Sequence, residues 1–231
     1  MSNKKKQSEE EILDVGEVYS KTEHFFENNK QTITYGLTAV LIIVAGIVYY
    51  FNFYMPPLQK EAESEMFYAQ QHFARDSFRL AMYGDNEGHL GFEQVASDYG
   101  STNAGNVANY YMGVSLLRTG DYEGAIAYLD RYSANDEITP SLKLGAIGDA
   151  YSELGDYEKA LGYYEDAANS ESNSFTTPIY LKKAGIAAEK LNKYGDARDF
   201  YESIKNDYPN SQEGRGIDKY IQRAKLMQEK A

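Results

Sequence analysis

The residue types that most often carry catalysis or bind metals are sparse in this sequence. The 231 residues include no cysteine, which excludes thiol nucleophiles, thiolate zinc sites and disulfide bonds. The three histidines, His24, His72 and His89, are scattered, and none is spaced from another as the ligands of a metal motif are. We therefore expect these histidines to be structural or solvated, and we expect no metal site and no cofactor.

Motifs of enzyme chemistry are also missing. The sequence has no glycine-rich phosphate loop, no HExxH pair and no serine in a nucleophile elbow. Carboxylate pairs such as Glu165 and Asp166 are adjacent on a predicted helix and point in different directions, as they do on a solvated face. The sequence therefore predicts that the protein is not an enzyme.

The balance of charge limits the partners that the chain can have. Lys and Arg total 23, Asp and Glu total 35, and the net charge is −12, most of it located after residue 60. Such an acidic domain repels a phosphate backbone, so nucleic acid is not an expected partner. It also repels an anionic lipid surface, so any association with a bilayer requires an inserted segment.

One segment is suited to insertion. No charged residue lies between Lys30 and Lys60, and the centre of this segment, residues 38–51, reads TAVLIIVAGIVYYF. A membrane-spanning helix needs about 20 mostly apolar residues, which this segment supplies. Aromatic residues gather at its downstream end, where an interfacial belt would lie. We expect one transmembrane helix at residues 31–56. A buried core helix is the less favoured alternative, because core helices of this length rarely lack charge on every face.

The lysines around the span predict its orientation. The tail, residues 1–30, has more Lys and Arg than the first twenty residues after the span, which places the tail in the cytoplasm and residues 57–231 outside it. A cleaved signal peptide is the competing interpretation. It would require a small-x-small site after the apolar run, where bulky aromatic residues stand instead.

Local signals predict the ends of this helix. Ser20 and Glu23 have the spacing of a capping box, so the helix is expected to begin near Ser20. Pro56 and Pro57 are expected to end it at about Met55, because proline donates no backbone hydrogen bond. In the tail a weak apolar stripe could dock on a cytoplasmic partner, although a loosely ordered tail is favoured. The stripe consists of Ile12, Val15, Val18 and Tyr19.

The soluble part repeats itself three times. Each copy has a glycine twelve residues before an alanine, with offsets of 35 and 37 residues between copies. The pairs are Gly113 with Ala125, Gly148 with Ala160, and Gly185 with Ala197. A tyrosine stands three residues before each alanine, and a large residue stands four after it: Leu129, Tyr164 or Tyr201. This pattern predicts two antiparallel helices per copy, with small residues where their backbones approach and large residues filling the seam.

The turns support this interpretation. Gly120-Asp121 and Gly155-Asp156 each combine a helix-stopping glycine with a capping aspartate, and the third copy departs with Asn192-Lys193. A period near 34 residues resembles the tetratricopeptide (TPR) family, in which helical hairpins stack into a solenoid. We therefore expect an all-α fold: one N-terminal transmembrane helix, then a TPR solenoid closed by a C-terminal capping helix.

The boundaries follow from this alignment. An irregular unit, residues 58–104, is expected to contain a helix from about Leu58 to Met82 and a loop at residues 84–88. After the repeats, Ser211 can cap the closing helix, whose apolar face keeps the solenoid end soluble. The expected repeats span residues 106–139, 141–174 and 178–211, and the expected capping helix spans residues 212–230.

In the TPR family the first helix of each repeat lines a concave groove that binds peptides. Carried over by register, this resemblance implies a protein-binding groove lined by Val107, Tyr110, Val114, Leu117, Arg118, Gly145, Asp149, Ser152, Lys182, Ile186 and Glu189. The groove is expected to be most apolar in the first repeat, unless a neighbouring helix covers that part. Asp149 and Ile186 stand where asparagines would be needed to clamp a chaperone C-terminal carboxylate, so that ligand is not expected.

The whole architecture is similar to the YfgM-like ancillary subunit of the bacterial SecYEG translocon. The segments NAGNVANYYMGVSLL, LGAIGDAYSELGDYEKAL and GIDKYIQRAK look like versions found in Bacteroidetes. The resemblance implies an inner-membrane protein with periplasmic repeats that works beside a membrane-anchored prolyl isomerase (PpiD-like). It also implies a chaperone-like role toward nascent or secreted client proteins. A generic anchored scaffold for envelope assembly and an enzyme with an unrecognised site are the alternatives.

Overall fold

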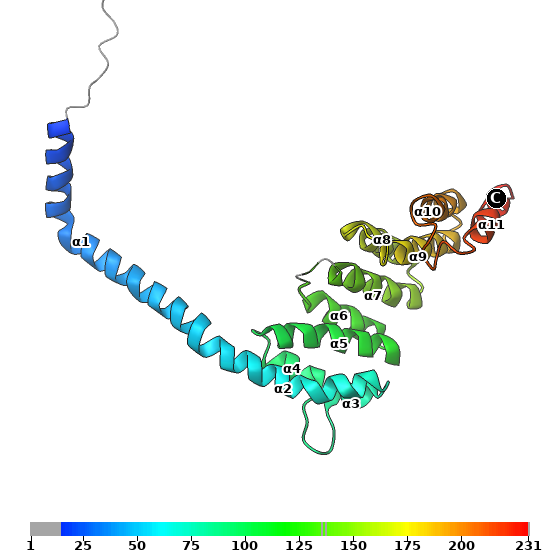
Figure 1. The fold of residues 1–231 in the computed structure, drawn as a ribbon, viewed down its shortest axis with the longest axis horizontal. Coiled ribbons are helices and arrows are strands. Elements are labelled where there is room, and N and C mark those ends of the chain that lie inside the picture. The colour runs from blue at the N-terminus through cyan, green and yellow to red at the C-terminus, as the bar shows by residue number, and fades with distance from the viewer. Residues whose placement is uncertain (1–14, 135, 137, 231) are drawn as a thin grey trace, which may run out of the picture. The chain divides into compact units, whose positions relative to one another are not determined.

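The computed structural model describes residues 15–134, 136 and 138–230, with side chains from residue 20 onward. These residues form helices joined by turns and include no strand, so the predicted all-α class is confirmed. The chain divides between Pro56 and Pro57 into two compact units (Figure 1). The apolar tail stripe begins at Ile12, outside the described residues, and its proposed docking stays a prediction.

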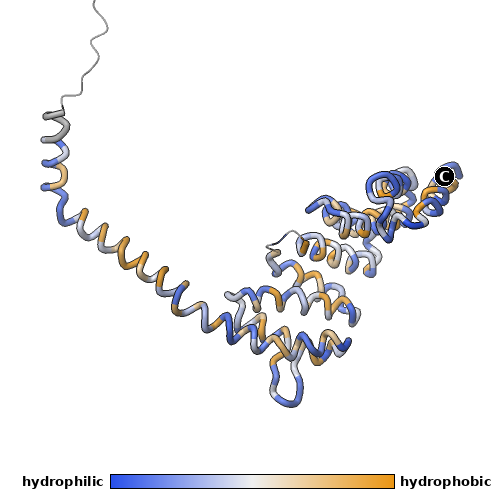
Figure 2. The backbone as a smooth tube through the Cα atoms, in the orientation of Figure 1, coloured by the Kyte–Doolittle hydropathy of each residue, from blue (hydrophilic) through white to orange (hydrophobic). Residues whose placement is uncertain are grey.

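The first unit is dominated by one long helix, α1 (Val15–Tyr49), followed by a π-helical segment, η1 (Tyr50–Tyr54). Hydrophobic residues occupy the second half of α1 (Figure 2). Leu41 and Ile42 are 68% and 67% exposed, so among the described residues no other segment covers them. The helix is long and apolar enough to cross a membrane, and it is not a core helix of this fold.

Both predicted ends of this helix are wrong. The helix already includes Val15 to Tyr19, so the Ser20–Glu23 spacing lies inside α1 and does not start it. Pro56 and Pro57 do not end it either, because they stand in the first turn of α2 (Met55–Ala74). Proline is tolerated at the start of a helix, where its missing N–H is not needed. The π segment just before it shifts the register, since the Met55 N–H bonds to the Tyr50 carbonyl five residues earlier.

The second unit begins with three helices: α2, α3 (Phe78–Tyr83) and α4 (Phe92–Asp98). The single helix expected from Leu58 to Met82 is wrong, because the chain turns after Ala74. Asp76 adopts a φ of 56°, and the Ser77 N–H bonds back to the His72 carbonyl at 2.9 Å. The turn lets α3 fold beside α4, where Phe92 and Val95 are fully buried.

Six helices then pair into three hairpins (Figure 1). Their bounds are α5 (Asn103–Thr119) with α6 (Tyr122–Arg131), α7 (Thr139–Glu153) with α8 (Tyr157–Ser170), and α9 (Thr177–Lys190) with α10 (Tyr194–Asp207). The buried apolar residues form two separate clusters, one across α2–α6 and one across α8–α11, and α7 lies between them.

The turns inside the hairpins follow the predicted chemistry. Gly120 and Gly155 adopt φ values of 88° and 79°, which favour glycine. The following aspartates cap α6 and α8, since Asp121 accepts from the Gly124 N–H at 2.9 Å and Asp156 from the Lys159 N–H at 3.2 Å. The third turn uses Asn192 at a φ of 60°.

The repeated glycines bring the two helices of each hairpin into contact. A Cβ placed on Gly113 would lie 2.7 Å from Leu129 Cγ, and one on Gly148 would lie 2.7 Å from the Tyr164 ring. A Cβ on Gly185 would overlap the Tyr201 ring in the same way. The predicted pairing of small and large residues across the seam is therefore confirmed.

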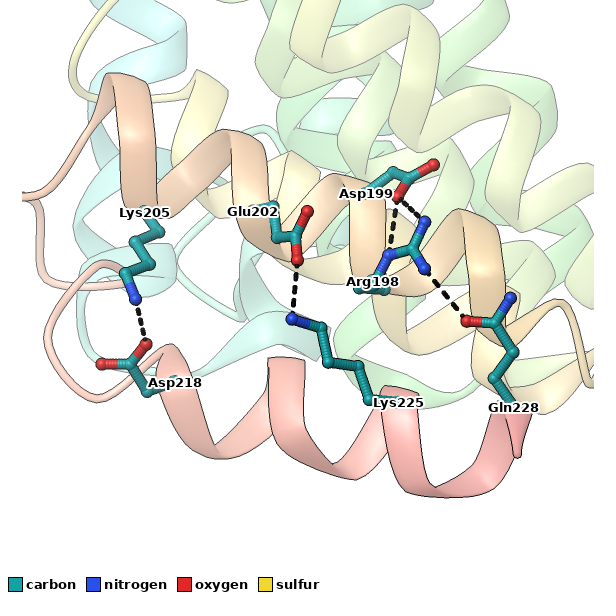
Figure 3. A network of polar contacts seen from close by, with 7 residues as sticks. All are labelled: Arg198, Asp199, Glu202, Lys205, Asp218, Lys225 and Gln228. Carbon is teal, nitrogen blue, oxygen red and sulfur yellow. Dashed lines mark hydrogen bonds and ion pairs between the residues drawn. The ribbon is translucent and has the colours of Figure 1, made fainter. Parts of the chain in front are cut away.

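The last helix, α11 (Asp218–Gln228), packs on α10 and buries Ile221 and Ala224. Ser211 does not cap it: the Ser211 hydroxyl accepts from the Gly214 N–H at 2.9 Å and so closes the turn before the helix. Polar contacts line the outer edge of this packing (Figure 3), for example Lys205 to Asp218 at 2.7 Å. Exposed pairs of this kind contribute about 0.2–1 kcal/mol each, so the apolar face holds α11 in place.

We predict that Gly148→Val lowers the free energy of unfolding by about 1–3 kcal/mol, because its side chain must displace the Tyr164 ring. Gly162→Ala is the matched control. Gly162 lies exposed in α8 with no atom within 4 Å of an added Cβ, so alanine should leave stability equal or raise it by up to about 1 kcal/mol. Urea unfolding followed by circular dichroism measures both. Equal stabilities for the two variants would contradict the close crossing.

Candidate functional site

A groove of about 910 Å³ runs across the first helices of the three repeats. Helices α5, α7 and α9 supply most of its lining, and α6 and α8 add tyrosines. The lining residues are Tyr110, Val114, Leu117, Arg118, Tyr122, Leu142, Ala146, Asp149, Ser152, Glu153, Tyr157, Tyr164, Tyr180, Lys183, Ile186, Ala187 and Lys190.

Most of the residues predicted from the repeat register meet in this groove. Those that do are Tyr110, Val114, Leu117, Arg118, Asp149, Ser152 and Ile186. Val114 is half-buried and Ile186 is 38% exposed, so each presents apolar surface. The register carried over from the repeat therefore locates the groove, although its binding role stays a prediction.

Four predicted residues lie elsewhere: Val107, Lys182 and Glu189, described here, and Gly145, described below. Val107 packs against the buried cluster of α2–α6. The ammonium group of Lys182 lies over the Tyr220 ring, 5.3 Å from its centroid, and Glu189 accepts from the Arg223 guanidinium, with one contact at 3.0 Å. Tyr220 and Arg223 belong to α11, so the closing helix covers this part of the third repeat. The repeat pattern could not show this, because it does not fix where the closing helix docks.

Several tyrosines were missed by the sequence prediction. Tyr180 is buried against Gly145, where any larger residue would collide with its ring, so Gly145 is covered and does not line the groove. Tyr122 and Tyr157 come from the first position of the second helices. A signal for them was present, because both precede a repeat alanine by three residues, but that signal was assigned to the seam between helices.

A polar cluster forms part of the groove lining. The Tyr164 hydroxyl donates to Asp149 Oδ1 at 2.8 Å, and Lys183 Nζ donates to both carboxylate oxygens at 2.6 and 2.7 Å. Lys183 also lies 5.7 Å from the centroids of the Tyr164 and Tyr180 rings. These contacts join α7, α8 and α9, and they satisfy the charge of Asp149. The cluster therefore fixes the groove wall and pairs the Asp149 carboxylate, whereas Glu153, which also lines the groove, stays exposed.

Two cations, Arg118 and Lys190, also line the groove. Arg118 and Lys190 are exposed, and among the residues that the structure describes neither forms an ion pair with a carboxylate. Lys190 lies 5.9 Å from the centroid of the Tyr157 ring. An apolar strip with tyrosine rings and unpaired cations can hold an extended or helical peptide through apolar contacts, hydrogen bonds and charge. It offers no nucleophile paired with a base.

The buried tyrosines make the repeats sensitive to alkali. Burial raises the pKa of Tyr164, and Asp149 raises it further; burial and Asp149 raise the pKa of Tyr180 in the same direction. The folded protein thus keeps protons that the unfolded chain loses near pH 10. This contribution to stability is complete below about pH 10 and is lost as the pH rises above it.

We predict that Tyr164→Phe flattens the fall in stability above about pH 10, because the variant keeps the ring and removes the ionisable hydroxyl. Urea unfolding midpoints at a series of pH values from about 9 to 11.5 measure this slope. Tyr194→Phe, which removes an exposed hydroxyl bonded to Asn192 at 2.7 Å, is the control. An unchanged slope for Tyr164→Phe would exclude this tyrosine as a source of the alkaline sensitivity.

Comparison with known proteins identifies the repeats. Family models described as "Tetratricopeptide repeat" match residues 107–136, 144–173 and 181–211. The chain is also 36% identical over 100 residues, 41% of its length, to the "Uncharacterized protein ycf37" of Guillardia theta, and it spans about half (54%) of that relative. No catalytic family is indicated by these matches. Three segments between residues 107 and 211 are therefore similar to tetratricopeptide repeats, and such repeats are typical of protein–protein interaction scaffolds.

Proposed function

We propose that this chain is a membrane-anchored, protein-binding subunit of the bacterial SecYEG translocon. In this proposal α1 holds the chain in the inner membrane with residues 1–30 in the cytoplasm, and residues 57–231 act in the periplasm. The repeats bind a membrane-anchored prolyl isomerase of the PpiD-like kind, or client proteins that emerge from the channel. Their role toward these clients is chaperone-like.

The observation that carries the binding role is the groove. Val114 and Ile186 present apolar surface beside Tyr110, and Arg118 and Lys190 bring positive charge to a chain whose net charge is −12. Apolar surface with aromatic residues and arginine is typical of interface residues that contribute most to binding.

Two observations support the place at the channel. The exposed apolar half of α1 is suited to lipid or to the surface of a membrane complex. The resemblance of the tail, the span and the acidic repeats to the YfgM-like family, inferred from the sequence, also favours this place. An anchored scaffold for envelope assembly remains the second candidate. Co-purification from gently solubilised membranes distinguishes the translocon subunit from the scaffold, because a scaffold would co-purify with a fixed partner and without the translocon.

We predict that a reporter active only in the periplasm works when it is fused after Ala231 and fails when it is fused before Lys30. The physical reason is the excess of lysine before the span, which keeps the tail on the cytoplasmic side. Reporter activity in cells expressing each fusion measures the topology, and a cytoplasm-specific reporter at the same two positions is the control. The reverse pattern would exclude both the periplasmic placement and the role at the channel exit.

We predict that Val114→Glu weakens partner binding at least tenfold while the chain stays at the channel. A carboxylate at position 114 replaces apolar contact surface with a hydrated charge that a partner must desolvate, or with a pair to Arg118 one turn later, and both changes weaken apolar binding. Ala127→Glu is the matched control, because it adds the same charge to the exposed face of α6. Quantitative co-purification, after circular dichroism shows both variants to be folded, compares them.

A third variant, in which residues 31–55 are replaced by an unrelated membrane span, tests the other surface. This variant should no longer co-purify with the translocon, and it should still bind the partner of the groove. Recovery of every partner at the wild-type level by folded Val114→Glu would show that the groove is not the binding surface.

A further inference from the structure

A second polar site lies outside the groove, at the end of α2. His72 is in the last turn of this helix, and Asp85 and His89 are in the loop between α3 and α4. Asp85 Oδ2 lies 3.1 Å from His72 Nε2 and 2.8 Å from His89 Nδ1. The fold thus brings two of the three histidines in the chain to one carboxylate oxygen, although their sequence spacing gave no metal motif.

The carboxylate and one imidazole are held in place by further contacts. Asp85 Oδ1 accepts from the backbone N–H groups of Glu87 and His89, at 2.9 and 3.2 Å, which fixes the direction of Oδ2. Tyr68, one turn before His72 on α2, stacks on the His89 ring with a centroid distance of 3.5 Å and an interplanar angle of 17°. Ligands oriented by such supporting contacts are a feature of metal sites.

Glu87 offers a further carboxylate near two of these groups. The ligand atoms of Asp85, Glu87 and His89 all lie within 4.8 Å of one another, and His72 adjoins this group through its 3.1 Å contact with Asp85. The side chains of His72, Asp85 and His89 are 20%, 13% and 25% exposed, so the site is sheltered yet open to a solute. Two imidazoles with one or two carboxylates suit zinc, which prefers four nitrogen, oxygen or sulfur ligands in a tetrahedron.

We propose that His72, Asp85, Glu87 and His89 form a binding site for a divalent transition-metal ion, with zinc as the best fit. Tetrahedral zinc with ligand bonds of about 2.0–2.1 Å places its ligand atoms about 3.3 Å apart. The distances of 3.1 and 2.8 Å from Asp85 to the two ring nitrogens are close to this value. Each imidazole stays neutral, moves its proton to the other ring nitrogen, and offers the vacated lone pair to the ion.

The ion would fasten the loop to α2. Gly84 and Gly88 turn the loop with φ values of 86° and 93°, and Gly84 approaches the His89 carbonyl so closely that a Cβ could not fit. A metal that joins His72 to this loop therefore connects α2 to the segment leading into α4, both of which contribute to the first buried cluster. Its expected effect is a more stable first cluster, because an ion that binds only the folded chain stabilises it.

The test uses the full-length protein in detergent, without a histidine tag and stripped by a chelator. Isothermal titration with zinc chloride should show one site per chain with micromolar or tighter affinity. Two variants remove ligands but keep hydrogen bonds to Asp85. In His72→Gln the amide nitrogen replaces Nε2, and in His89→Asn it replaces Nδ1. Each should lower zinc affinity at least tenfold.

His24→Gln is the matched control, since His24 lies in α1 in the other unit and should leave zinc affinity unchanged. Thermal unfolding by circular dichroism gives a second readout. Zinc should raise the midpoint of wild type and of His24→Gln, and it should not raise that of the double variant His72→Gln/His89→Asn. No zinc binding by folded wild type, or equal affinity in all variants, would overturn the proposal and leave Asp85 as a hydrogen-bonded loop anchor.

Discussion

The fold of the repeats depends on one kind of contact. A large side chain on the second helix of each hairpin packs directly against a glycine on the first helix. Leu129 on Gly113, Tyr164 on Gly148 and Tyr201 on Gly185 repeat this contact three times. Because the backbones approach until only hydrogen fits, the spacing of the two helices is set by the thickness of a ring or an isobutyl group. Tyr180 on Gly145 extends the rule from one repeat to the next. The groove lies on helices whose positions these contacts determine.

The closing helix determines where the groove ends. α11 buries the apolar face of α10. Its Arg223 also donates a hydrogen bond to Glu189 of α9, and its Tyr220 ring contacts the ammonium group of Lys182 of α9. The third repeat therefore loses an acidic residue from the accessible lining. The first repeat keeps Val114, Leu117 and Arg118 in the groove. The same helix that keeps the end of the solenoid soluble thus shapes the charge of the surface that a partner meets.

Sequence periodicity predicted the structural features that recur in every repeat and missed the features that occur only once in the chain. The hairpins, their turns and the crossing glycines follow from spacing, because each copy must satisfy the same packing. The start of α1, the prolines inside α2 and the break at Asp76 are single events set by neighbouring backbone, and local rules misjudged all three. The site at Asp85 could be found only from the structure, because the turn after Ala74 is what brings His72 and His89 to the same carboxylate. In the groove, Val107 and Glu189 were misplaced because other helices pack over them.

The division of the core into two clusters has a consequence for how the chain acquires its structure. The first cluster is complete once α6 exists, whereas the buried residues of the second come from α8 onward, with Leu144 and Tyr151 of α7 packed against them. Nearly every packed helix pair is adjacent or close in sequence. A solenoid of such local contacts can form in order from its N-terminal end. The first helices of the second unit can therefore be folded while the last repeats are still being synthesised, which limits the time that their apolar surface is exposed.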